Sequence, residues 1–272
     1  MNYRVIALDL DGTLLNSAKT ILPETLEALH KAQQSGVDII LATGRHHSAI
    51  HPFYQALQLT TPAICCNGTY LYDYPQQQVL DNDPMTVGQA EKIIRSLETY
   101  RITGLLYADD AMLYQQPTPH VIRTQAWGEK LPEAQRPVFR QVPSLSEAAR
   151  QAKRLWKFAL SHQDTQQLHA FVQHITDEAG VTCEWSWVDQ VDIAQRGNSK
   201  GKRLQEWLTS RGLSMQDVIA FGDNYNDLSM LESAGLGVAM GNADDAIKAR
   251  AGWVIGDNNH PSIAEAIYQK VL

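Results

Sequence analysis

The feature that most constrains this chain is a short apolar segment that ends at two aspartates. Residues 5–8 are all apolar, and Asp9-Leu10-Asp11-Gly12-Thr13 follows them directly. In an extended strand alternate side chains share a face, so Asp9 and Asp11 can reach one pocket at the strand end. Gly12 permits a tight turn that brings backbone amides close to a ligand. Carboxylates beside amides suit a metal-bound phosphate, although an ordinary strand followed by an Asp-Gly turn would have the same sequence.

The same strand-end pattern recurs along the chain. Three later strand-like runs, nearly all apolar apart from Asp38, end in polar residues: 37–42 at Thr43-Gly44, 63–66 at Asn67-Gly68, and 218–221 at Gly222-Asp223. Nearly continuous apolar strands that alternate with helices are typical of a parallel sheet covered on both faces. Such sheets bind ligands at the carboxyl ends of their strands. The sequence therefore predicts an α/β fold with a doubly wound, Rossmann-like parallel sheet.

The middle of the chain has a different pattern. Short strand-like runs, amphipathic helices and proline-rich turns follow one another without the regular strand–helix alternation. This pattern is typical of an antiparallel α+β unit. We therefore expect a discontinuous core of residues 1–83 and 189–272, interrupted by an α+β cap domain of residues 84–188.

Composition limits the possible partners. The 272 residues are 44% hydrophobic and 19% charged, which is typical of a globular protein. The net charge of −7 argues against nucleic acid or an anionic membrane as the main partner, because a phosphate backbone demands a basic surface. No apolar run is long enough for a membrane span, and the three cysteines form no disulfide or zinc pattern. We expect a cytoplasmic monomer.

Four strand or helix ends supply a consistent set of polar side chains. They are Asp9 with Asp11, Thr43, Lys200, and Asp223 with Asn226 and Asp227. Each has an ordinary alternative: a turn, a surface lysine or a helix cap. However, a lysine at a helix N-terminus is disfavoured by the helix dipole, so an anionic partner would explain Lys200. Four such ends on one sheet favour a shared site.

These segments resemble the four motifs of the haloacid dehalogenase superfamily, in order and at suitable spacing. The motifs are Asp9-Leu10-Asp11-Gly12-Thr13, Thr43-Gly44-Arg45, Ser199-Lys200-Gly201 and Gly222-Asp223-Asn224-Tyr225-Asn226-Asp227. The insertion between the second and third motifs resembles the large α+β cap of the Cof-type phosphatases. The likeness covers the whole chain, and it is greatest to the enterobacterial Cof-type enzymes that act on pyridoxal phosphate and sugar phosphates.

The resemblance implies a Mg²⁺-dependent phosphatase that hydrolyses small phosphomonoesters, such as pyridoxal 5′-phosphate, through an aspartyl-phosphate. Asp9 would be the nucleophile and Asp11 the general acid and base. Asp9, the backbone carbonyl of Asp11, and Asp223 would bind Mg²⁺, and Asp227 would orient that shell. The phosphate oxygens would be held by Thr43, Lys200 and Asn226, together with the backbone amides of Leu10 and Gly44.

Two other functions use similar residues. A phosphomutase of the same superfamily would return the phosphoryl group to another hydroxyl instead of releasing it. A phospho-accepting receiver, which is a signalling protein, also combines an acidic cluster, a threonine and a lysine on a parallel sheet. The large insertion argues against a receiver, and so does Asp11, which would destroy the long-lived acyl phosphate that a receiver needs.

Overall fold

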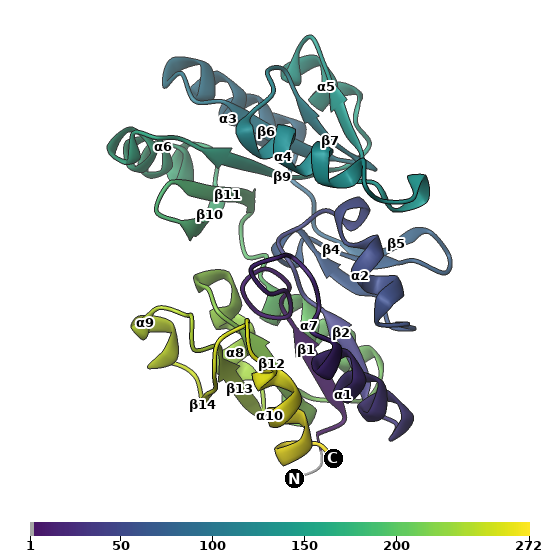
Figure 1. The fold of residues 1–272 in the computed structure, drawn as a ribbon. Coiled ribbons are helices and arrows are strands. Elements are labelled where there is room, and N and C mark those ends of the chain that lie inside the picture. The colour runs from purple at the N-terminus through teal and green to yellow at the C-terminus, as the bar shows by residue number, and fades with distance from the viewer. Residues whose placement is uncertain (1–2) are drawn as a thin grey trace. The chain divides into compact units, whose positions relative to one another are not determined.

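The computed structural model describes residues 3–272, which form two compact units (Figure 1). The first unit, the core, contains the residues up to Gly44 together with Phe53–Asp81 and Ser199–Leu272. The second unit, the cap, contains Asn82–Asn198 and the short segment Arg45–Pro52. Among the described residues, no helix has both the length and the apolar character needed to cross a membrane.

The core contains a five-stranded sheet in which every neighbouring pair is parallel. The strand order is β14-β13-β12-β1-β2, with bounds β1 Val5–Leu8, β2 Asp38–Leu41, β12 Val218–Gly222, β13 Leu236–Ala239 and β14 Trp253–Val254. All four residues of β1 are buried, because the strand has neighbours on both sides and helices over both faces. β1 lies at the centre, between β12 and β2, so both strands that carry the predicted aspartates are adjacent.

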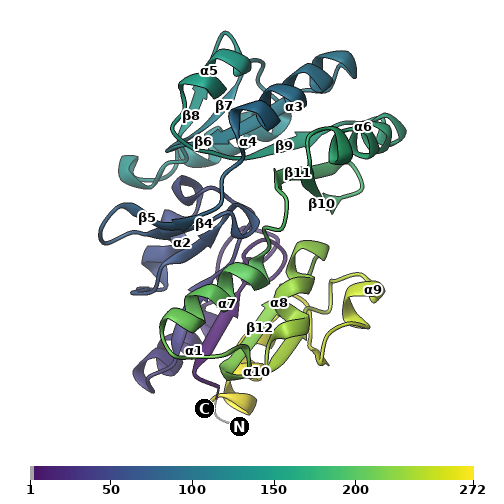
Figure 2. The same cartoon turned by 180° about the vertical axis from the view of Figure 1, so that it is seen from behind.

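Helices cover both faces of this sheet (Figures 1 and 2). On one face α1 packs against α10, and on the other α7 packs against α8. Apolar side chains of α7 and α8, such as Leu204 and Leu231, form one cluster with buried residues of the strands, such as Val5 and Ala220. The helices of the core are α1 Pro23–Gln34, α2 His51–Ala56 (which begins in the cap segment), α7 Lys200–Ser210, α8 Leu228–Ser233, α9 Asp245–Lys248 and α10 Ser262–Lys270.

The predicted strand at residues 63–66 does not belong to the parallel sheet. β3 Ala63–Cys65 belongs to a three-stranded sheet of order β3-β4-β5, with β4 Tyr70–Asp73 and β5 Gln78–Asn82. It pairs with β4 in the antiparallel sense, because the chain turns back at Cys66–Gly68 instead of entering a crossover helix. A single parallel bridge between Ala42 and Ile64 still links β3 to the end of β2.

The cap contains a six-stranded sheet of order β10-β11-β9-β6-β7-β8. Its strands are β6 Gly104–Ala108, β7 Ala111–Tyr114, β8 Phe139–Gln141, β9 Leu155–Ser161, β10 Val181–Trp187 and β11 Gln190–Gln195, and only the β7–β8 pair is parallel. The helices are α3 Val87–Thr99, α4 Pro119–Gly128, α5 Leu145–Gln151 and α6 Thr165–Glu178. Residues of α3, α5 and α6 form the cap's own apolar core with alternate residues of the sheet, among them Ile93, Phe158 and Phe171.

The cap differs from the predicted 84–188 in three respects. It begins at Asn82. It extends to Asn198, because β11 pairs with β9 and β10 and therefore belongs to the cap sheet. It also includes Arg45–Pro52, which bind cap backbone groups. The amide of Val138 donates to the Ser48 hydroxyl at 3.2 Å, and His46 Nε2 lies 3.2 Å from the carbonyl oxygen of Asp109. Contacts of this kind join segments far apart in the sequence, so a boundary drawn from local pattern cannot include them.

Candidate active site

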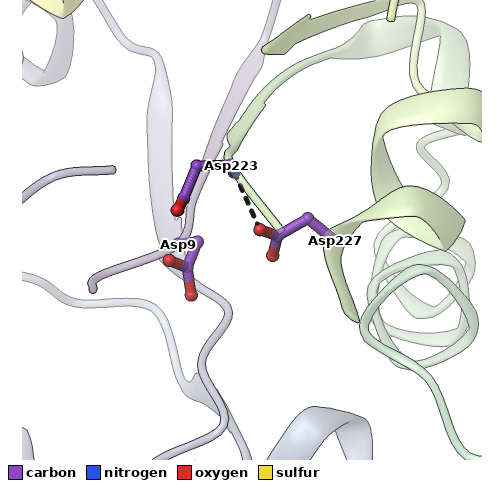
Figure 3. Close-up of side chains that lie close together, drawn as sticks. All are labelled: Asp9, Asp223 and Asp227. Atoms are coloured by element: carbon purple, nitrogen blue, oxygen red, sulfur yellow. Dashed lines mark hydrogen bonds between the residues drawn. The ribbon is translucent and has the colours of Figure 1, made fainter. Parts of the chain in front are cut away.

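Three aspartates converge at the carboxyl ends of β1 and β12. Asp9 follows β1, and its amide donates to the carbonyl of Phe221 in β12 at 3.1 Å. One carboxylate oxygen from each of Asp9, Asp223 and Asp227 lies within 4.8 Å of the others. Figure 3 shows the three side chains together, with Asp227 reaching toward the backbone of Asp223. The two adjacent strands thus bring residues more than 200 positions apart into one acidic cluster.

The turn after β1 closes on Asp223. Gly12 has φ of +85°, and a Cβ there would lie 2.3 Å from Oδ2 of Asp223. Only glycine both adopts this conformation readily and leaves that space free. The next residue, Thr13, donates its hydroxyl to Oδ1 of Asp223 at 2.7 Å. The Gly-Thr pair therefore sets the position of one metal-ligand candidate directly.

Asp227 is fully buried and uses both of its carboxylate oxygens. Oδ2 accepts the backbone amides of Asp223 at 2.9 Å and Asn224 at 3.0 Å, and Oδ1 accepts Lys200 Nζ at 2.7 Å. With Asn224 it forms a capping box around the short turn Tyr225–Asp227. The side chain thereby fixes the backbone that carries Asp223.

Lys200 lies between two of these carboxylates. It is the first residue of α7, after the cap residue Ser199, and its ammonium is completely buried. Nζ donates to Oδ1 of Asp9 at 2.6 Å as well as to Asp227. Burial alone would lower the pKa of Lys200, but the two carboxylates hold it above its ordinary value. The lysine is therefore charged, and it holds the Asp9 carboxylate in one orientation.

The buried cluster carries more negative than positive charge. Burial raises the pKa of Asp9 well above its ordinary value, against the opposing effect of Lys200. Burial, reinforced by the charge of Asp227, raises the pKa of Asp223 to about 7. In both cases burial is the largest cause of the raised pKa, and the neighbouring carboxylates add to it. A divalent cation would supply the missing charge, and an all-oxygen donor set fits a hard ion such as Mg²⁺ or Ca²⁺.

Three other predicted site residues lie at strand ends or turns of the core. Thr43 is buried at the end of β2, and its amide and carbonyl bind Ile64 and Asn67. The carbonyl of Leu10 accepts the amide of Leu15 at 2.9 Å, which shapes the turn after β1. Gly44 is the last core residue before the segment that belongs to the cap.

Two predicted residues have partners that the sequence did not indicate. The Asp11 carboxylate is not a member of the three-aspartate cluster, and it accepts Lys19 Nζ at 2.8 Å in a pair that is about half exposed. The Asn226 side chain donates through Nδ2 to Oδ1 of Asn67 at 3.1 Å. The structure therefore brings together Asp9, Asp223, Asp227 and Lys200, and it gives Asp11 and Asn226 contacts of their own.

Known proteins share this architecture over the whole chain. Residues 6–267 match the haloacid dehalogenase-like hydrolase family. The chain belongs to this family. It is 61% identical over 272 residues to the pyridoxal phosphate phosphatase YbhA of Escherichia coli (strain K12), with 100% of both chains covered. It is 28% identical to the 5-amino-6-(5-phospho-D-ribitylamino)uracil phosphatase YitU of Bacillus subtilis (strain 168), covering 96% of this chain and 94% of that one.

Solved structures agree with this assignment. A haloacid dehalogenase-like hydrolase from Bacillus subtilis superposes with a TM-score of 0.86 at 25% identity, covering 97% of this chain and 99% of that one. The predicted family, the predicted α/β fold and the prediction of a hydrolase of this family are therefore confirmed.

Sequence reasoning missed three side chains near the site: Thr13, Lys19 and Asn67. Thr13 stood in the first motif without a role, and Lys19 lies in a segment with no strand or helix pattern. Asn67 carried a usable signal, because it follows β3 in the same way as Asp9 follows β1 and Thr43 follows β2. The strand-end pattern marks Asn67-Gly68, yet Asn67 is not among the predicted site residues.

Proposed function

We propose that this enzyme is a Mg²⁺-dependent phosphatase that hydrolyses small phosphomonoesters, with pyridoxal 5′-phosphate as its first candidate substrate. The observation that carries the proposal is the buried cluster of Asp9, Asp223, Asp227 and Lys200 at the carboxyl edge of the sheet. The choice of substrate is supported by 61% identity over the full length of a pyridoxal phosphate phosphatase. Sugar phosphates are the second candidates, as the Cof-type resemblance implies.

The acidic cluster fits a bound Mg²⁺. Asp9, Asp223 and the backbone carbonyl of Asp11 would hold it, whereas both oxygens of Asp227 already accept hydrogen bonds. The ion would neutralise the excess carboxylate charge and offset the charge of the substrate phosphate. The amides of Leu10 and Gly44, together with Thr43, Lys200 and Asn226, would hold the non-bridging phosphate oxygens.

In the first step, a carboxylate oxygen of Asp9 attacks phosphorus in line with the ester oxygen. The new bond gives an aspartyl-phosphate, the bond to the ester oxygen breaks, and Asp11 gives its proton to the departing alkoxide. Lys200 fixes the orientation of the Asp9 carboxylate for this attack, because it binds Oδ1. Asp11 must leave Lys19 to act, and an exposed ion pair costs little to break.

In the second step, Asp11 takes a proton from a water molecule. The resulting hydroxide oxygen bonds to phosphorus, and the bond between phosphorus and Asp9 breaks. The products are inorganic phosphate and the original Asp9 carboxylate. The cycle splits one difficult hydrolysis into two displacements at the same phosphorus atom.

The direct test is phosphate release from pyridoxal 5′-phosphate and a panel of sugar phosphates, with Mg²⁺ and with EDTA. We expect release only with the metal. Return of the phosphoryl group to a second hydroxyl would indicate a phosphomutase instead, and an aspartyl-phosphate that persists for minutes would indicate a receiver. A cytoplasmic location and a monomeric state remain predictions, and sedimentation at working concentration tests the latter.

Asp9→Asn should abolish turnover and leave the fold intact, since the amide oxygen can still accept Lys200. We expect a loss of at least about 10⁴-fold in kcat, as for other covalent nucleophiles. Asp38→Asn is the matched control, because Asp38 opens β2 and lies at the opposite end of the same sheet, paired with Arg211 at 2.7 Å. Appreciable turnover by Asp9→Asn would exclude the covalent mechanism.

Asp11→Asn tests the proton transfers. With an aryl phosphate, whose phenolate leaves without protonation, the variant should still phosphorylate Asp9. With an alkyl phosphate we expect a loss of about 10²- to 10⁴-fold, the usual range for general acid catalysis. Equal losses with both ester classes would show that Asp11 does not protonate the leaving group.

A further inference from the structure

The turn between β3 and β4 has an unusual backbone. Cys66, Asn67 and Gly68 are consecutive and have φ values of 50°, 56° and 89°, all in the left-handed region. Residues other than glycine seldom adopt this conformation, and they do so only where the surrounding contacts hold them there. Cys66 and Asn67 are both buried, so such contacts are available.

A buried arginine holds this turn from α7. Arg203 is 3% exposed, and its Nε and Nη2 donate to the carbonyls of Gly68 at 3.0 Å and Thr69 at 3.4 Å. Nη1 pairs with Asp81 at 2.6 Å and Glu206 at 2.8 Å, which balances its charge. The turn is therefore fixed to the same helix that begins with Lys200.

The turn also touches the backbone just before Lys200. A Cβ on Gly68 would lie 2.1 Å from the carbonyl oxygen of Ser199, so glycine permits a contact that no other residue would. On its other side the amide of Asn67 donates to the carbonyl of Thr43 at 3.0 Å. One tight turn is thus packed between two segments that carry proposed phosphate-binding residues.

Asn67 contacts a third proposed phosphate-binding residue through its side chain. Its Oδ1 accepts Nδ2 of Asn226 at 3.1 Å across 159 positions of sequence. A primary amide has two N–H donors and one oxygen acceptor, and either end can point at a ligand when the group rotates. In this structure Asn67 presents its oxygen, so Asn226 turns its nitrogen toward Asn67 and has a second N–H that could donate to an anion.

We propose that Asn67 is a positioning residue for phosphate binding. It orients the Asn226 carboxamide so that it donates to a phosphate oxygen, and it fixes the backbone of Thr43. This inference rests on the proposed function, because it takes Asn226 and Thr43 as phosphate-binding groups. It adds a residue outside the four motifs, and it predicts coupling between Asn67 and Asn226.

The first experiment measures phosphate affinity in Asn67→Gly. Glycine keeps the left-handed backbone and removes only the side chain. Loss of one neutral hydrogen bond should raise the Kd for inorganic phosphate in Mg²⁺ buffer about 3- to 10-fold by calorimetry. KM should rise by a similar factor and kcat should change less, because the contact is present in both ground and transition states.

Gln58→Gly is the matched control. Gln58 has φ of 51° and is exposed. Gln58→Gly therefore introduces glycine at a left-handed position, as Asn67→Gly does, but at a residue that has no role in the proposed site. It should leave Kd, KM and kcat at wild-type values. If Asn67→Gly lowers only the melting temperature and leaves Kd and KM unchanged, Asn67 serves the turn alone and the proposal is wrong.

A double-mutant cycle separates orientation from general damage. If Asn67 acts through Asn226, Asn67→Gly in an Asn226→Ala background should cause little further loss of phosphate affinity. If the two substitutions act independently, their fold-losses of phosphate affinity will multiply in the double variant, and that result would overturn the proposal.

A crystal structure of the wild-type protein with Mg²⁺ and inorganic phosphate decides the question even if the variant does not fold. We expect Asn226 Nδ2 to contact both Asn67 Oδ1 and a phosphate oxygen. Phosphate bound without Asn226, or Asn226 rotated away from Asn67, would contradict the inference. Turnover by the wild-type enzyme tests the proposed function separately, so the two failures are distinguishable.

Discussion

Replacing Asp227 by asparagine gives a sharp test of how the acidic cluster is held. The side chain is fully buried and accepts three hydrogen bonds, two from backbone amides and one from Lys200. Asparagine has nearly the same shape but only one acceptor end. Its NH₂ group must therefore face either the two amides or the ammonium, and in both cases donors oppose donors.

The expected cost follows from these contacts. Hydrogen bonds to a charged group contribute about 1.5–3 kcal/mol each, and breaking a buried ion pair costs about 3–5 kcal/mol. Relief of repulsion among the three carboxylates offsets part of this loss. We therefore expect Asp227→Asn to lower the free energy of unfolding by about 3 kcal/mol in metal-free buffer. Stabilisation by added Mg²⁺ should also decrease, because the backbone of Asp223 loses its anchor.

Urea unfolding followed by circular dichroism, with and without Mg²⁺, measures both effects. Hydrogen exchange of the segment after β12 localises the change. Asp217→Asn is the matched control, because Asp217 closes the same kind of capping box with Ser214 in a partly exposed turn and has no lysine partner of this kind. Equal losses of unfolding free energy in the two variants would refute the argument that burial and the ion pair with Lys200 make Asp227 more important for stability.

Two further predictions concern the cap histidines and the turn after β3. Burial lowers the pKa of His46 to about 3 and of His47 to about 2, so between about pH 6.5 and 3 the unfolded chain binds more protons than the folded one. The contribution of the two histidines to stability is complete above pH 6.5 and is lost as the pH falls, by at most about 1.4 kcal/mol per pH unit for each histidine. Between pH 7.5 and 5 the urea midpoint should therefore fall less steeply with pH in His47→Phe than in the wild type. An equal fall in the two proteins would contradict the lowered pKa of His47. Gly68→Ala should destabilise the protein more than Gly36→Ala in thermal unfolding, because both glycines have φ near +87° but only Gly68 would clash, with the carbonyl oxygen of Ser199. Equal changes in melting temperature would mean that backbone conformation, rather than the close approach, determines the cost.

The sequence predicted the polar edge of the core sheet because that edge is encoded locally. An apolar run makes a buried strand, the first polar residues after it mark the carboxyl end, and parallel neighbours bring such ends together. The order of residues alone therefore placed Asp9, Thr43 and Asp223 on one edge. The pattern of element ends also marked Lys200, Asn226 and Asp227, which lie on a helix start and a turn, and the family motifs then gave these residues their expected roles.

The same local reasoning placed the insertion but not its limits. The strand Gln190–Gln195 lies beyond the predicted boundary of the cap. It belongs to the cap because it pairs with β9 and β10, and its composition does not show this pairing. The segment Arg45–Pro52 lies between two core elements in sequence, yet His46 and Ser48 in it bind the backbone of Asp109 and Val138 in the cap. Membership of a folded unit depends on contacts across long sequence separations, which no short window contains.

Tertiary structure alone decided how each charged side chain is used. Asp9 and Asp11 are two residues apart in one motif, but one is buried against Lys200 and the other forms an exposed pair with Lys19. Asn67 became visible as a partner of Asn226 only when strands far apart in the chain were brought together. The sequence by itself determined that Asp9 and Asp223 would lie at strand ends, because each directly follows a buried apolar strand. Which hydrogen bonds those groups would form depended on distances of about 3 Å between segments that only folding brings into contact.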